Sequence, residues 1–192
     1  MDIVIDKLNM AYGEKQVLRD YSARFPHGET TVIMGPSGCG KTTLLSVLMG
    51  FLQPDSGEIR GLPEKISAVF QEDRLCEDFS SLSNVAMVLS KKSDEPERLL
   101  RRLGLGEELK TPVKALSGGM KRRVAIARAL CYEGELLILD EPFKGLDKET
   151  RKTVMAVVAE ETKGRTVIAV THDPEEAAFL SGNILRMEPV GA

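Results

Sequence analysis

Residues 35–42 read Gly-Pro-Ser-Gly-Cys-Gly-Lys-Thr and match the pattern G-x-x-x-x-G-K-[ST]. The apolar run 31–34 before them predicts a buried strand, and residues 43–49 after them predict a helix. Glycines let such a loop turn its backbone N–H groups toward an anion, and the helix N-terminus adds a partial positive charge. Strand, glycine loop and helix in this order predict an α/β core with a phosphate-binding loop, rather than a glycine-rich turn of no function.

The residue types in this loop assign roles within a nucleotide site. We expect Lys41 to reach the terminal phosphates of ATP and the Thr42 hydroxyl to ligate Mg²⁺. The residues that we expect to bind the nucleotide here are Gly35, Pro36, Ser37, Gly38, Cys39, Gly40, Lys41, Thr42 and Thr43.

Length and charge restrict the class of protein. The chain has 192 residues and a net charge of −3, which suits one compact domain and argues against a nucleic-acid-coating surface. The three cysteines, Cys39, Cys76 and Cys131, are far apart, which favours a reducing cytosol. The first residues lack the basic and apolar regions of a signal peptide, and no apolar run approaches membrane-spanning length. If this protein serves a membrane, it does so through a partner.

Strand and helix signals alternate along the chain. Their alternation predicts a mostly parallel sheet with helices on both faces. Charge rises and strand signals vanish over residues 71–115, so we expect a helical subdomain of roughly 72–134 inserted into a single domain 1–192. The predicted strands are 2–8, 17–25, 29–34, 66–70, 136–139, 165–170 and 182–187, and the predicted helices after the first are 82–89, 97–103, 118–131, 148–163 and one that opens at 173–176.

Two acids end the apolar strand 136–139. Ligands of α/β sheets bind at the carboxyl ends of strands, where Asp140 and Glu141 stand. Adjacent residues of an extended backbone point to opposite sides, so the two acids have different roles. We expect Asp140 to hold Mg²⁺ beside Thr42, and Glu141 to polarise the water that attacks the γ-phosphate. The alternative is that both acids simply end a strand in solvent.

The order of these motifs resembles the ATP-binding cassette (ABC) ATPases, and the resemblance covers almost the whole chain. It implies the ABC ATPase fold, a P-loop core with a mostly parallel sheet, an N-terminal antiparallel β part and the inserted helical subdomain. The matching motifs are the Walker A loop at 35–42, the Q-loop Gln71, the signature 116–119, Walker B at 136–140 with the catalytic Glu141, the D-loop at Gly145-Leu146-Asp147 and the switch His172.

The resemblance implies further roles for single residues. Gln71 touches Mg²⁺ and the attacking water, and His172 contacts the γ-phosphate. Tyr12 stacks on adenine, although a tyrosine in a strand also serves packing. Ser117, Gly118 and Gly119 cover the ATP of a second copy, with Asp147 nearby, in a head-to-tail homodimer or a dimer with a paired ABC subunit. Their simpler interpretation is a helix with a serine N-cap.

Within the family, a lone cassette resembles the ATPase subunit of a bacterial importer. Residues 70–75 and 82–85 resemble the group that imports nitrate, sulfonates and taurine. This implies a permease docked on the segment after Gln71, an indirect role for a solute-binding protein, and a place on the inner face of the cell membrane. Met120 and Lys144 depart from the common residues, and the short tail after His172 leaves no room for a regulatory domain.

Four other functions compete with the importer ATPase. They are a soluble ABC regulator, an exporter ATPase, a P-loop kinase and a cassette that no longer hydrolyses ATP. A single cassette without a coiled-coil insertion argues against the first of these, and the signature argues against the kinase. Intact Lys41, Asp140, Glu141 and His172 argue against a degenerate cassette.

Overall fold

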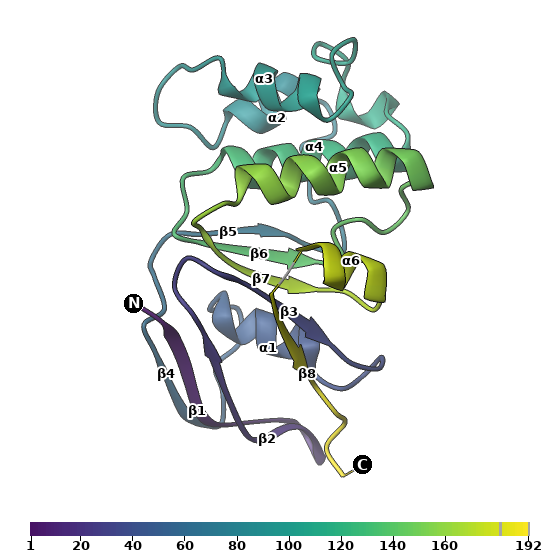
Figure 1. The fold of residues 1–192 in the computed structure, drawn as a ribbon. Helices are drawn as coiled ribbons and strands as arrows, with labels where there is room; N and C mark the ends of the chain where they lie inside the picture. The colour runs from purple at the N-terminus through teal and green to yellow at the C-terminus, as the bar shows by residue number, and fades with distance from the viewer. Residues whose placement is uncertain (181, 192) are drawn as a thin grey trace.

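The computed structural model describes residues 1–180 and 182–191. Its N-terminal part is an antiparallel sheet of β1 (Ile3–Tyr12), β2 (Lys15–Phe25) and β4 (Ser56–Arg60), in the order β2-β1-β4 (Figure 1). The first strand runs to Tyr12, beyond the predicted end at residue 8. Strand β4 is absent from the predicted strands, because its residues are exposed except for the half-buried Ile59 and lack an apolar pattern.

The second sheet is parallel throughout and follows the order β5-β6-β7-β3-β8. Every residue of the neighbouring strands β6 and β7 is buried, as continuous apolar runs in central parallel strands predict. The strands are β3 (Thr30–Met34), β5 (Ile66–Val69), β6 (Leu136–Asp140), β7 (Thr166–Val170) and β8 (Asn183–Arg186).

Helices cover both faces of the parallel sheet. In Figure 1, α1 lies between the two sheets, and α4 and α5 cross the opposite face with α2 and α3 beyond them. Helix α4 has the predicted bounds, whereas α2 is shorter than its periodic stretch. The helices are α1 (Lys41–Leu48), α2 (Ser81–Ala86), α3 (Glu95–Arg102), α4 (Gly118–Cys131), α5 (Lys148–Glu161) and α6 (Pro174–Leu180), with a 3₁₀ turn at Val113–Ala115.

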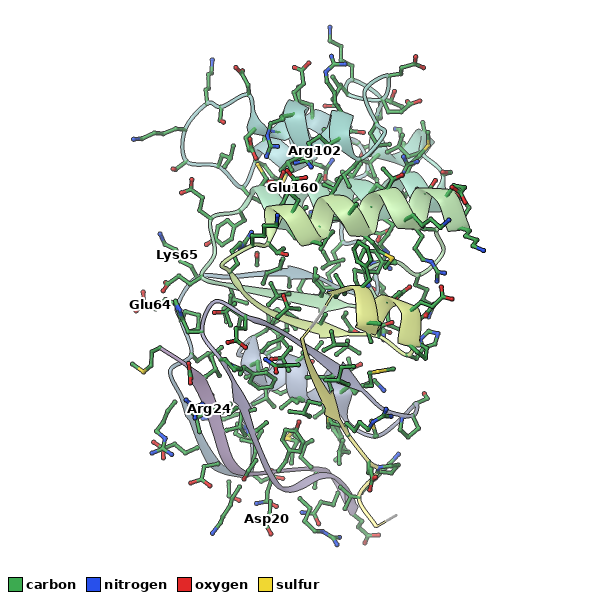
Figure 2. All side chains as sticks on the ribbon, in the orientation of Figure 1. Asp20, Arg24, Glu64, Lys65, Arg102 and Glu160 are labelled. Carbon is green, nitrogen blue, oxygen red and sulfur yellow. The ribbon has the colours of Figure 1, made fainter. Side chains whose placement is uncertain are left out.

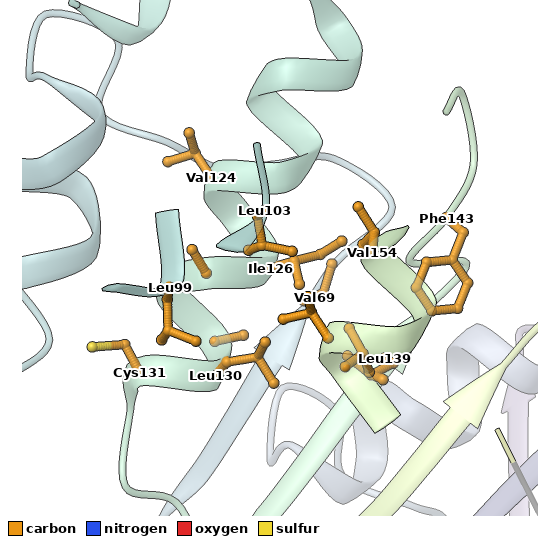
Figure 3. Packing of buried hydrophobic residues seen from close by; sticks show 14 of the residues in the cluster. Val69, Leu99, Leu103, Val124, Ile126, Leu130, Cys131, Leu139, Phe143 and Val154 are labelled. Carbon is orange, nitrogen blue, oxygen red and sulfur yellow. The ribbon is translucent and has the colours of Figure 1, made fainter. Parts of the chain in front are cut away.

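The parallel sheet separates two hydrophobic cores. Along β6, Leu137 and Leu139 face the helices α3, α4 and α5, whereas Leu136 and Ile138 face α1 and the antiparallel sheet. Figure 3 shows the first core, where Leu139 of the sheet lies near side chains of the helices. Burial on both faces makes the sheet a rigid support for the loops at its carboxyl edge.

Ion pairs join α3 to α5 across the surface of the helical layer. Arg98 Nη2 lies 2.9 Å from Glu161 Oε2, and Arg102 Nη2 lies 2.5 Å from Glu160 Oε2. Figure 2 shows Arg102 and Glu160 between the two helices. Such solvent-accessible pairs contribute about 0.2–1 kcal/mol each. Within the described part of the chain, no helix has the length and apolar character needed to cross a membrane.

Candidate active site

A cavity of about 490 Å³ opens where β3, β6 and β7 end and the first hairpin meets them. Its volume lies within the range of about 300–1,000 Å³ that small-molecule sites occupy. Segments far apart in the sequence meet here, from residue 12 to residue 172. The lining residues are Tyr12, Lys15, Val17, Gly35, Pro36, Ser37, Gly38, Gly40, Lys41, Thr42, Thr43, Gln71, Glu141, Val170 and His172.

The phosphate loop wraps around the ammonium group of Lys41. Its Nζ donates hydrogen bonds to the carbonyl oxygens of Gly35 at 2.7 Å and Pro36 at 2.8 Å. Gly40 has φ +101°, a left-handed conformation that suits glycine, and it immediately precedes α1. A Cβ on Gly35 would come within 2.3 Å of the Met187 carbonyl oxygen. The loop is therefore bent tightly and carries a buried positive charge at its centre.

Cys39 behaves differently from its neighbours in the loop. Its side chain is buried and its Sγ lies 3.6 Å from Lys41 Nζ, beneath the loop. Cys39 is absent from the residues that line the cavity, and its backbone N–H donates to the Pro36 carbonyl at 3.4 Å. A direct contact of Cys39 with the nucleotide stays a prediction.

Asp140, Gln71 and Thr42 have the chemistry of a Mg²⁺ site. Asp140 is buried at the end of β6, and its Oδ1 has no hydrogen-bond partner among the described residues. Burial and the neighbouring Glu141 raise the pKa of Asp140, and a hydrogen bond from the Gln71 side chain and the charge of Lys41 oppose this. Carboxylate, hydroxyl and amide oxygens are the hard ligands that Mg²⁺ prefers, usually with few carboxylates and with substrate phosphates. The residues present fit this ion.

Glu141 departs from the extended backbone assumed in the sequence analysis. Its φ of 47° is left-handed, so the argument that two acids on an extended chain face opposite sides was wrong. The Glu141 N–H donates to the Val170 carbonyl at 2.9 Å, which fixes this turn. Non-glycine residues with positive φ cost about 1–3 kcal/mol and cluster at functional sites.

The Glu141 side chain still faces different partners from those of Asp140. Its Oε1 lies 3.3 Å from His172 Nδ1, and its Oε2 lies 3.3 Å from Lys144 Nζ. Asp140, in contrast, lies beside Gln71. The two acids therefore have different partners, as the sequence predicted, although a left-handed turn and not an extended backbone separates them. The turn places Glu141 on the cavity wall.

Tyr12 stands at the mouth of the cavity at the end of β1. Its side chain is 51% exposed, so the ring has a free face for stacking. Lys15 pairs with Tyr12 across the β1–β2 hairpin, and Val17 follows on β2. Sequence reasoning missed Lys15, Val17 and Val170 as cavity residues, although alternation along β2 from the hairpin partner of Tyr12 places Lys15 and Val17 on one face.

The signature residues lie outside this cavity. The Ser117 Oγ accepts a hydrogen bond from the Met120 N–H at 3.3 Å, which confirms the predicted N-cap of α4. Gly118 has open space beside it, and Gly119 lies close to the D-loop at the Gly145 carbonyl. Asp147 caps α5 by accepting from the N–H groups of Glu149 and Thr150. Within one chain, these groups do not line the cavity.

Comparison with known proteins decides the family. A model of the family described as ABC transporter matches residues 18–144, about two thirds of the chain. The chain belongs to the ABC transporter family. It is an ATP-binding subunit and an ATPase of that family, as the motifs predicted.

Curated members of the ABC family are similar along most of the chain. The Taurine import ATP-binding protein TauB of Pseudomonas aeruginosa is 36% identical over 190 residues, with 91% of this chain and 72% of that protein covered. The Aliphatic sulfonates import ATP-binding protein SsuB 2 of Pseudomonas fluorescens is 37% identical over 197 residues, with 97% and 73% covered.

Solved ABC cassettes share the fold. The dimeric post-hydrolysis state of the ATP-binding cassette MJ0796, bound to ADP and Pi, has a TM-score of 0.86 and 27% identity, with 98% of this chain and 96% of that chain covered. A second dimeric structure of MJ0796, described as a bacterial ABC transporter cassette, has a TM-score of 0.82. The predicted ABC ATPase fold is confirmed, with its antiparallel N-terminal sheet and its parallel sheet covered by helices.

Proposed function

We propose that this chain is the ATPase subunit of an importer for a small sulfonate of the taurine class, and that it drives a separate permease by ATP-dependent closure of a dimer. The observation that carries the dimer is the arrangement within one chain. The cavity holds the phosphate loop and Glu141, whereas Gly118 faces open space away from it. The relatives that import taurine and aliphatic sulfonates support the cargo class.

We infer a division of labour in the cavity. Lys41 binds the terminal phosphates and Tyr12 stacks on adenine. Thr42, Gln71 and Asp140 would hold Mg²⁺, which would supply positive charge beside the phosphates. Pro36, Ser37, Gly38, Cys39, Gly40 and Thr43 supply the rest of the phosphate cradle.

Hydrolysis in this proposal depends on Glu141. Its carboxylate accepts the proton of the attacking water, because it lines the cavity next to the phosphate loop. His172 lies 3.3 Å from that carboxylate and orients it toward the γ-phosphate. Lys144 holds the second carboxylate oxygen from the solvent side, where its side chain is 63% exposed.

A second copy of the chain completes each site. Ser117, Gly118 and Gly119 begin α4, where backbone N–H groups and the helix dipole suit the phosphates of a partner's ATP. Asp147 lies on the same side, because Gly119 adjoins the D-loop. Bound ATP then joins the two copies, and hydrolysis releases them.

We infer the permease contact from exposed apolar side chains, of which Phe51 stacks on Phe70 while Phe79 and Met87 follow Gln71 in the chain. Phe51, Phe79 and Met87 are about half exposed, and the Arg74 guanidinium lies 4.0 Å from the centre of the Phe70 ring. We infer that a cytoplasmic segment of the permease docks here, which places this single domain 1–192, with its helical subdomain 72–134, on the inner face of the membrane. A solute-binding protein acts only through the permease.

The Glu141→Gln variant tests this function. It removes the proton acceptor but keeps size and hydrogen bonding, so it is expected to bind ATP, lose on the order of 10²–10⁴ in turnover, and form a dimer with ATP. Light scattering with and without ATP measures the dimer. Glu64→Gln is the matched control, since Glu64 is exposed and outside the cavity lining. A Glu141→Gln protein that stays monomeric in ATP would refute the shared site.

Cargo is tested separately by radiolabelled uptake in the source organism. Deletion of the gene is expected to abolish taurine or alkanesulfonate uptake, and the Glu141→Gln allele is expected not to restore it. Normal sulfonate uptake in the deletion strain would refute the cargo class while leaving the ATPase intact.

A further inference from the structure

Helix α4 holds the segment around Gln71 through two arginine side chains. Arg122 donates from Nη1 to the Phe70 carbonyl and from Nη2 to the Gln71 carbonyl, both at 2.5 Å. Arg128 donates from Nη1 to the Arg74 carbonyl at 2.9 Å and from Nη2 to the Asp73 carbonyl at 3.1 Å. Four carbonyl groups of residues 70–74 therefore accept hydrogen bonds from one helix, while the segment itself forms no helix or strand.

Arg122 is buried, so its charge needs hydrogen-bond and ion-pair partners within the protein. Its side chain is 7% exposed and its Nη1 also lies 3.2 Å from Asp73 Oδ1. A buried charge is costly unless it is paired and hydrogen-bonded. The planar guanidinium fork donates to two carbonyls and lies within ion-pair distance of a carboxylate at the same time, which the single ammonium of lysine does not reproduce. The Arg122 contact is therefore specific in geometry.

The same helix begins at the signature. Ser117 caps α4, and Arg122 follows one turn later on the same rigid element. Gln71, at the other end of the Arg122 contact, lines the nucleotide cavity beside Asp140. The guanidinium of Arg122 thus joins the first turns of α4 directly to the Gln71 backbone.

We propose that Arg122 is a positioning residue that couples the signature to Gln71, so that engagement of the partner's ATP at Ser117 places the Gln71 side chain for hydrolysis in the chain's own cavity. This inference rests on the proposed shared site. It differs from a purely structural role, in which Arg122 only stabilises the loop.

The test compares Arg122→Lys and Arg122→Gln with Arg165→Lys. Arg165 is a matched control, because it also donates to backbone carbonyls, those of Leu130, Tyr132 and Gly134, near the other end of α4. Both Arg122 variants are expected to bind ATP as the parent does and to lose on the order of 10- to 100-fold in kcat, as expected for a catalytic group misplaced by about 1 Å. Arg165→Lys is expected to lower Tm without this loss in kcat.

Two readouts separate positioning from stability. In a Gln71→Ala background, Arg122→Lys is expected to cause no further loss in kcat, because both substitutions remove the same contribution. Hydrogen exchange in the nucleotide-free protein is expected to speed up at residues 70–74 and to stay unchanged at residues 35–42. The exchange result needs neither ATP nor Mg²⁺.

Several results would overturn the inference. They are an unchanged kcat in both Arg122 variants, an equal loss of kcat in Arg165→Lys, an undiminished Arg122 effect in the Gln71→Ala background, and unaltered exchange at residues 70–74. If the parent hydrolyses ATP and the Glu141→Gln protein dimerises with ATP, any of these results refutes the coupling alone. A Glu141→Gln protein that stays monomeric refutes the proposed function instead.

Discussion

Gly118→Ala separates the stability of one chain from the assembly of two. Apart from its chain neighbours and the backbone of its own helix, no heavy atom of the described residues lies within 4 Å of the position that a Cβ would take on Gly118, and its φ is not left-handed. Alanine at such a position stabilises a protein by about 0.4–1 kcal/mol, because the unfolded chain loses freedom. For a chain of 192 residues, in which 1 kcal/mol shifts Tm by about 2–4 °C, the expected rise is about 1–4 °C.

The same methyl group is expected to be harmful in the dimer. The α4 N-terminus must bring its N–H groups against a phosphate of the partner's ATP, and glycine permits that close approach of backbone to ligand. Losing one preorganised donor costs on the order of 10²–10³ in rate. We therefore expect Gly118→Ala to bind ATP normally as a monomer, to hydrolyse it slowly and to form no ATP-dependent dimer in the Glu141→Gln background.

Thermal unfolding, binding of a fluorescent ATP analogue and light scattering measure these three quantities. Gly50→Ala is the inverse control, since Gly50 also has open space but a φ of +73°. Strain from a left-handed alanine costs about 1–2 kcal/mol, so this variant is expected to lose Tm and to keep the dimer. A normal ATP-dependent dimer in the Gly118→Ala protein would refute the placement of the signature against a second copy.

Three further substitutions test the cavity. Lys41→Ala removes the charge at the centre of the phosphate loop and is expected to abolish binding of the fluorescent analogue; unchanged affinity would contradict that role. Asp140→Asn is expected to raise Tm at neutral pH without nucleotide. The pKa of Asp140 is raised in the folded state, so the folded protein binds this proton more tightly and loses stability as pH rises above the ordinary pKa of an aspartate. The gain in Tm is expected to disappear in acid, and a gain that persists there refutes the assignment. Gly35→Ala puts a Cβ 2.3 Å from the Met187 carbonyl oxygen and is expected to destabilise the protein by about 1–3 kcal/mol, measured by urea unfolding; an unchanged midpoint would contradict the close approach.

Strong local signals predicted most of the elements. The buried strands β6 and β7 carry continuous apolar runs, and α4 begins at a serine cap, so neighbouring residues alone predicted the bounds of α4 and, to within one residue, those of β6 and β7. Most residues of strand β4 are exposed, so its sequence does not predict a strand. Its antiparallel pairing with β1 holds it in an extended conformation. Extended structure of that kind depends on a partner far away in the chain.

The sequence by itself determined the family, the phosphate loop and the two acids at the end of β6, because each depends on residue types at short spacing. Only the tertiary structure decided that Glu141 is left-handed and lies between His172 and Lys144. Likewise, only the folded chain brings Arg122 to the Gln71 carbonyl, 51 residues away in the sequence. Contacts of this range arise from the packing of α4 against the sheet, and no local pattern encodes them.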